Sequence, residues 1–158
     1  MNIAPTIEGG LRIDPETEQD WHILRAIALD ANGHGIDLAN RLGALITDET
    51  VAEDWQDIVV PDLREMFMDD INHIQACIEA AAAFPKGGEN PIWITREDAF
   101  TWYSSLNQAR LALEEKYKFG QDPESDAANL TPLRHEALLR SHFYCALQSF
   151  ILKHALTL

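Results

Sequence analysis

One short pattern occurs twice in this sequence, and it constrains the fold more than any other feature. In each copy an isoleucine, Ile13 or Ile94, precedes a residue suited to capping a helix, and a tryptophan follows eight positions after the isoleucine. Alternating apolar residues before the cap indicate a short strand, and the cap predicts a helix directly after it. Because a lone strand leaves backbone groups unpaired, we expect segments 11–13 and 92–94 to pair with each other.

Apolar residues recur at helical spacing through most of the remaining chain, with turn residues between the stretches. The predicted helices cover about 15–31, 37–46, 51–59, 61–84, 96–119 and 131–156. Asp14 is the expected cap of the first helix, and Pro61 is expected to separate the third helix from the fourth. Residues 1–10 are expected to form a loose lead-in. The sequence therefore predicts a single mainly α domain over 1–158, a helical bundle of five or six helices with a minimal two-stranded β-ribbon.

The charge of the chain narrows the classes of partner. Its 158 residues include 26 Asp and Glu but 12 Lys and Arg, which gives a formal net charge of −14. An acidic chain with scattered basic residues repels phosphate, so we expect neither nucleic acid nor an anionic membrane as a partner. No stretch is apolar enough to span a bilayer, the N-terminus has no signal-peptide pattern, and Cys77 and Cys145 are expected to be buried thiols. These features favour a cytoplasmic protein.

Several segments together resemble a known bacterial family. The resemblance is carried by 9–13 with the first helix, by 61–64, and by 92–99 with Trp102, Leu106, Asn107 and 110–113. Over about residues 8–120 the chain resembles the DUF2017 family, a domain of unknown function, whereas the last helix, 131–158, is expected to be an addition to the family core. The resemblance implies no particular activity. Members of the family are often encoded near the adaptor of the Clp protease, which implies a protein-handling context.

One helix face carries groups that can bind a divalent metal ion. Glu65, Asp69 and His73 recur every four residues, so they lie on one flank of the predicted helix 61–84. Carboxylates and imidazole are metal ligands, and a metal site completed by another helix is one hypothesis. The alternative is a solvated acidic face, which the sequence favours because no second Glu-x-x-His motif completes a di-metal bundle. We therefore expect no cofactor.

A polar seam borders the apolar stripe of the predicted helix 96–119, and it consists of Tyr103, Asn107, Arg110 and Glu114. Asparagine is unfavourable inside a helix, so a specific contact is expected here. In the structural interpretation Asn107 and Arg110 hydrogen-bond a neighbouring loop, with the bend at 60–62 as the candidate. In the functional interpretation they contact a ligand or partner. The structural interpretation is favoured because buried polar groups are usually hydrogen-bonded within the protein.

The last predicted helix is apolar over more than one face, and its candidate interface residues are Phe143, Leu147, Phe150 and Ile151. Such a helix either lies at the centre of a bundle or docks on another chain, so a homodimer through this helix is one expectation. No catalytic motif is present, and no catalytic residue is predicted. We expect a non-enzymatic protein-interaction module. The competing hypothesis is a metal-binding helical bundle or metal-dependent enzyme that uses the acidic helix face.

Overall fold

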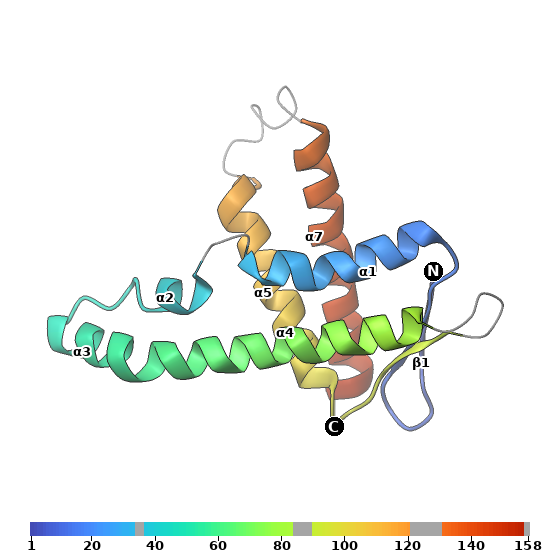
Figure 1. Ribbon diagram of the computed structural model, residues 1–158, viewed down its shortest axis with the longest axis horizontal. Helices are drawn as coiled ribbons and strands as arrows, with labels where there is room; N and C mark the ends of the chain where they lie inside the picture. The colour runs from blue at the N-terminus through green and yellow to red at the C-terminus, as the bar shows by residue number, and fades with distance from the viewer. Residues whose placement is uncertain (34–36, 84–89, 121–130, 157–158) are drawn as a thin grey trace.

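The computed structural model describes residues 1–33, 37–83, 90–120 and 131–156. It confirms a mainly α-helical fold with a small antiparallel sheet. The body of the molecule consists of α1 (Glu18–Ala31), α4 (Val60–Ala82), α5 (Ala99–Tyr117) and α7 (Pro132–Ile151). As Figure 1 shows, α1 and α4 run side by side across α5 and α7, and α5 contacts each of the other three helices.

The sheet contains the predicted ribbon and one further strand. Strand β2 (Leu11–Asp14) pairs antiparallel with β3 (Ile92–Ile94), which confirms the predicted pairing, and its other edge pairs antiparallel with β1 (Asn2–Pro5). The expectation of a loose lead-in is therefore wrong for β1, because the central strand offers backbone groups on both edges. The turn between β1 and β2 needs glycine at Gly10, because a Cβ at this position would clash with the carbonyl oxygen of Ile94.

Both helices that follow these strands begin three residues later than predicted. The cap of α1 is Thr17 rather than Asp14: the Thr17 hydroxyl accepts from the backbone N–H of Asp20, and the Asp20 carboxylate accepts from that of Thr17. This reciprocal capping box satisfies two backbone donors at once, which a single cap cannot do. Before α5, the hydroxyl of Thr95 accepts a hydrogen bond from the backbone N–H of Asp98. This hydrogen bond closes one turn of the chain ahead of the helix.

Pro61 does not separate two helices. The chain continues from α3 (Glu49–Asp54) through the π-helical turn η2 (Trp55–Val59) directly into α4. Val60 has helical backbone angles, and its N–H reaches the carbonyl of Trp55 in the wider π pattern. The prediction of a break at Pro61 is wrong, because the π turn shifts the register just where proline lacks a donor.

The core lies where α5 meets the sheet and the other three helices of the body. Its largest fully buried side chains are Leu11, Ile13, Leu24, Ile27, Ile74, Ile78, Ile94, Trp102, Leu106, Leu113, Tyr144 and Leu147. Each long helix contributes residues at a spacing of three or four to this set, which is the pattern of an amphipathic helix with one face inward. The tryptophan of the second strand–helix pattern, Trp102, is completely buried in it.

A buried polar cluster joins α1 to α7 inside this core. Asp30 is 2% exposed. Its carboxylate accepts hydrogen bonds from Nε of Arg140 at 2.7 Å and from the hydroxyl of Tyr144 at 2.7 Å. Burial, together with the neighbouring Asp30 carboxylate, raises the pKa of Tyr144 far above its usual range, so the phenol stays protonated and acts as a donor. The cluster fixes the position of α7 relative to α1.

Candidate functional site

Helix α2 (Leu38–Leu42) and helix α3 lie at one end of the molecule, away from α7 (Figure 1). The chain after α2 packs closely against η2, since a Cβ on Gly43 would lie 2.6 Å from the indole ring of Trp55. Glycine at this position allows the two segments to touch. We call residues 44–63, which extend from this contact through α3 and η2 into the start of α4, the acidic arm.

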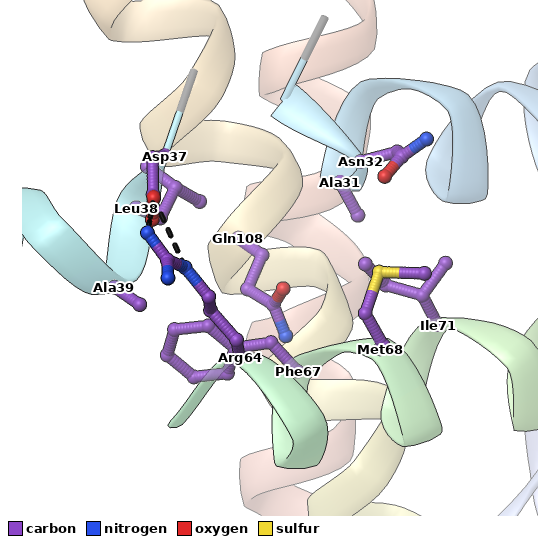
Figure 2. A pocket seen from close by; sticks show the side chains of 10 residues that line it. All are labelled: Ala31, Asn32, Asp37, Leu38, Ala39, Arg64, Phe67, Met68, Ile71 and Gln108. Atoms are coloured by element: carbon purple, nitrogen blue, oxygen red, sulfur yellow. Dashed lines mark hydrogen bonds and ion pairs between the residues drawn. The ribbon is translucent and has the colours of Figure 1, made fainter. Parts of the chain in front are cut away.

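Polar contacts made by Asp37 and Arg41 hold α2 against the body. The Asp37 carboxylate caps α2 by accepting from the backbone N–H of Asn40 at 3.1 Å, and it also accepts from both Nε and Nη2 of Arg64 on α4 (Figure 2). The hydrogen bond from Arg64 lowers the pKa of the Asp37 carboxyl. At the other end of α2, Nη1 of Arg41 lies 3.1 Å from a carboxylate oxygen of Glu115 on α5. Helix α2 is therefore held in place by side-chain contacts with both α4 and α5.

A small hollow of about 220 Å³ lies between the end of α1 and helices α2, α4 and α5. Figure 2 shows its lining residues, which are Ala31, Asn32, Asp37, Leu38, Ala39, Arg64, Phe67, Met68, Ile71 and Gln108. Most of these side chains are apolar, and the Asp37–Arg64 ion pair lies along one side. The small hollow shares three of its lining residues, Leu38, Phe67 and Gln108, with a second and larger one.

The large hollow, about 420 Å³ in volume, lies between α2, the turn after it, α4 and α5. It is lined by Leu38, Arg41, Leu42, Ala44, Leu45, Phe67, Ser104, Asn107, Gln108 and Leu111. At its mouth Leu42 is 50% exposed and Leu45 is 90% exposed, so apolar surface continues from the hollow onto the outside of the molecule. Adjoining exposed apolar side chains of this kind are typical of a surface that another molecule covers.

A nearly buried carboxamide lies in the wall that the two hollows share. Gln108 is 3% exposed. Among the described residues its side chain makes one hydrogen bond, a long one of 3.4 Å donated to the hydroxyl of Ser104. A carboxamide has two N–H donors and a carbonyl acceptor, so Gln108 keeps further hydrogen-bonding capacity inside an otherwise apolar wall.

The surface next to the large hollow is strongly acidic. Residues 44–63 contain six Asp and Glu and no Lys or Arg. All six of these carboxylates are exposed, and they belong to Asp48, Glu49, Glu53, Asp54, Asp57 and Asp62. Besides Leu45, two large apolar side chains of the arm are exposed among them: Val51 is 51% exposed and Ile58 is 63% exposed. The arm therefore presents negative charge and apolar area together.

Residues of the predicted polar seam on α5 face two different places, helix α7 and the large hollow. Arg110 donates to the carboxamide oxygen of Gln148 on α7 at 2.6 Å, and the amide of Gln148 donates to the backbone carbonyl of Tyr103 at 3.2 Å. Arg110 thus contacts α7 rather than the bend at 60–62, because the seam faces the neighbouring helix. Asn107 is exposed and lines the large hollow.

The three candidate metal ligands do not come together. Glu65 and Asp69 are exposed on α4, whereas His73 lies beside the start of α5, with its Nε2 atom 3.1 Å from a carboxylate oxygen of Asp98. Across the described parts of the chain, no three His, Cys, Asp or Glu side chains are grouped as a metal site requires.

His73 contacts both a cysteine and an aspartate at this point, a combination that sequence reasoning missed. The Sγ atom of Cys77 lies 3.7 Å from Nε2 of His73, the same nitrogen that contacts Asp98. A nucleophile relay needs the two ring nitrogens to contact different partners. Burial and the Asp98 charge also raise the pKa of the Cys77 thiol, which is the opposite of activation. The cluster links α4 to α5, and its signal in the sequence was the spacing of four between His73 and Cys77.

The four candidate interface residues of α7 have different environments. Leu147 is 1% exposed and Ile151 is 0% exposed, so both belong to the core of this chain and neither is available to a partner. Phe143 is partly buried against the core, and Phe150 is 41% exposed. The expectation of buried cysteines is also wrong for Cys145, which is exposed on the same helix.

The described residues thus form a mainly α-helical domain with a short antiparallel sheet at one end. The chain belongs to the family described as domain of unknown function DUF2017, whose model matches residues 38–153. The match includes most of the last helix, which was expected to be an addition to the family core. It does not include β2 or α1, so the matched range differs from the expected range of about 8–120. Comparison with curated proteins and with solved structures found no match. In the described ranges, none of the helices is both long enough and apolar enough to cross a membrane.

Proposed function

We propose that this chain is a non-enzymatic protein-interaction domain that binds another protein through the large hollow. The observation that carries the proposal is the continuity of the hollow with the exposed side chains of Leu42 and Leu45. Leaving Leu45 in water costs about 2 kcal/mol relative to burying it. A binding partner that covers this side chain recovers that free energy.

The construction of the site supports the same proposal. The wall of the hollow that bears Leu42 is a short helix held by the Asp37–Arg64 and Arg41–Glu115 contacts. A preformed wall lowers the entropic cost of binding because less of the surface must become ordered. Among the described residues that line the hollow, none is a nucleophile paired with a base, so the lining favours recognition over chemistry.

A capture experiment with matched variants tests this proposal. The double variant Leu42→Ser, Leu45→Ser removes apolar area at the mouth of the hollow. The control Leu29→Ser removes an exposed leucine elsewhere, on α1, because the 65% exposure of Leu29 lies between those of Leu42 and Leu45. We expect the tagged wild-type protein and Leu29→Ser to recover one stoichiometric partner from an extract of the source cells. The double variant should lose it. Equal recovery by all three proteins would refute this role for the hollow.

A homodimer through α7 is the second candidate, and a specific observation favours it. Leu139 is 52% exposed and Phe150 is 41% exposed, and Phe143 lies between them at helical spacing on the same helix. Such a stripe can pair with its copy across a two-fold axis. Phe150→Glu should convert a dimer to a folded monomer in sedimentation equilibrium, with Leu133→Glu as the control because Leu133 is 70% exposed at the opposite end of α7. A wild-type monomer would rule this candidate out.

A further inference from the structure

We infer that the partner bound at the large hollow is a basic amphipathic helix, with its apolar side chains in the hollow and its Lys and Arg side chains along the acidic arm. The inference rests on the function proposed above and adds the chemical class of the partner.

The mouth of the hollow indicates an extended partner rather than a small apolar ligand. A molecule confined to about 420 Å³ contacts Phe67 and Leu111 in the wall, but it leaves most of Leu45 in water, because that side chain is 90% exposed. A helix that lies across the mouth covers Leu42 and Leu45 from outside while inserting side chains at positions i, i+3, i+4 and i+7. Helix-in-groove recognition has this geometry.

The negative charge of the arm indicates that the partner carries positive charge. The six carboxylates of residues 44–63 face solvent without a basic residue among them. Asp48 is three residues after Leu45, so their Cα atoms are at most about 11 Å apart. A helix of about 18 residues is about 27 Å long and spans from the hollow to α3. Lys and Arg on the part of the helix that reaches α3 then lie near Asp48 and the carboxylates of α3, which raises the association rate and disfavours acidic partners.

The carboxamides of Gln108 and Asn107 offer hydrogen-bonding groups that suit a bound peptide. Both side chains line the large hollow, and Gln108 keeps hydrogen-bonding capacity in its wall. Carboxamides are both donors and acceptors, so they suit the polar groups at the edge of a bound helix. The α7 helix of a second copy fits less well, because Arg140 is held by Asp30 and Arg134 donates to the carbonyl of Tyr117.

Two synthetic peptides test the inference with the full chain. One is an 18-residue helix of leucine and lysine with a leucine stripe, and the other has the same leucines with glutamate in place of lysine. Fluorescence anisotropy measures the affinity of each peptide at low and at physiological salt. We expect the lysine peptide to bind at least about tenfold more tightly than the glutamate peptide, and the difference to shrink as salt screens the arm.

Variants distinguish a specific site from attraction to an acidic protein. Glu53→Gln, Asp54→Asn and Asp57→Asn together neutralise part of the arm and should weaken lysine-peptide binding about tenfold. The control neutralises three exposed carboxylates outside the arm, with Glu8→Gln, Glu97→Gln and Glu136→Gln. This control variant has the same net charge as the arm variant and should bind the lysine peptide as tightly as the wild type does. The double variant Leu42→Ser, Leu45→Ser should also lose at least about tenfold in affinity.

Each other outcome overturns the inference in an identifiable way. Equal binding of the two peptides, or equal weakening by the arm variant and its control, shows that no specific basic helix is recognised. If neither peptide binds while partner capture still depends on Leu42 and Leu45, the partner class is wrong and the proposed function stands. If capture is also independent of these leucines, both fail. If the protein forms a dimer and the double variant Leu42→Ser, Leu45→Ser dissociates it, a second copy of the chain is the occupant instead.

Discussion

Replacing Arg140 by methionine should destabilise this protein far more than replacing an exposed arginine. Arg140 donates two hydrogen bonds to the carboxylate of Asp30, one from Nε at 2.7 Å and one from Nη2 at 3.2 Å. The Asp30 side chain is 2% exposed and that of Arg140 is 21% exposed. Methionine keeps most of the apolar length of the side chain, so the substitution removes chiefly the charge and the two hydrogen bonds.

The expected loss follows from the burial of the carboxylate. Removing one partner of a buried ion pair costs about 3–5 kcal/mol, because the remaining charge stays in the interior. Since Arg140 is partly exposed and Tyr144 still donates to Asp30, we expect the lower end, about 3 kcal/mol. For a domain of this size, 1 kcal/mol changes Tm by about 2–4 °C, so Tm should fall by about 6–12 °C.

The assay is urea unfolding followed by circular dichroism, with Arg25→Met as the matched control. Arg25 makes the same kind of contact with Glu79, at 2.8 Å, but the two side chains are 43% and 49% exposed. This surface pair should contribute about 0.5 kcal/mol. Adding Asp30→Asn to Arg140→Met should recover part of the loss by removing the uncompensated charge. If Arg140→Met and Arg25→Met cost the same free energy, burial of Asp30 does not have the effect that we derive from it.

Three further perturbations test other contacts. Gly43→Ala should lower the free energy of unfolding by about 1 kcal/mol in the same assay, because the added Cβ meets the indole of Trp55; a gain in stability would contradict this. Iodoacetamide should modify the exposed Cys145 before Cys77, whose thiol has a raised pKa, and mass spectrometry showing equal rates would contradict that order. The lowered pKa of Asp37 means that its charge stabilises the fold above its ordinary pKa of 3.8, and that this contribution is lost as pH falls through the lowered value. Asp37→Asn should therefore be less stable than wild type at pH 7, and the difference should shrink as the pH falls through the lowered pKa of Asp37. A difference independent of pH would contradict this.

The parts of the fold that depend on local signals could be predicted from the sequence. The β2–β3 pair and the long helices follow from alternation, helical periodicity and capping residues within a few positions of each other. Strand β1 was missed because its only strong apolar residue is Ile3, and it is ordered by an edge of β2 that no local pattern describes. The continuous helix through Pro61 was missed because the compensating π turn, in which the N–H of Val60 reaches the carbonyl of Trp55, has no local pattern in the sequence.

The candidate site was harder to predict because three separated segments form it. Asn107 was identified as a candidate contact, and it lies at the rim of the large hollow. The leucines of α2 and of the turn after it were not identified, although Leu38, Leu42 and Leu45 recur at spacings of four and three. Such a short helix cannot bury all of them against the body, and that excess was the available signal. The position of α2 over α5 depends on tertiary contacts, which sequence spacing does not reveal.

The buried Asp30 cluster also determines how the chain can be shortened. The family model matches residues 38–153, yet Asp30 lies on α1, outside that range. A fragment limited to the matched residues would retain Arg140 and Tyr144 without the carboxylate that they surround, and β3 without β2 beside it. The smallest fragment that can fold with its core complete must therefore begin at or before β2, well ahead of the segment by which the family is recognised.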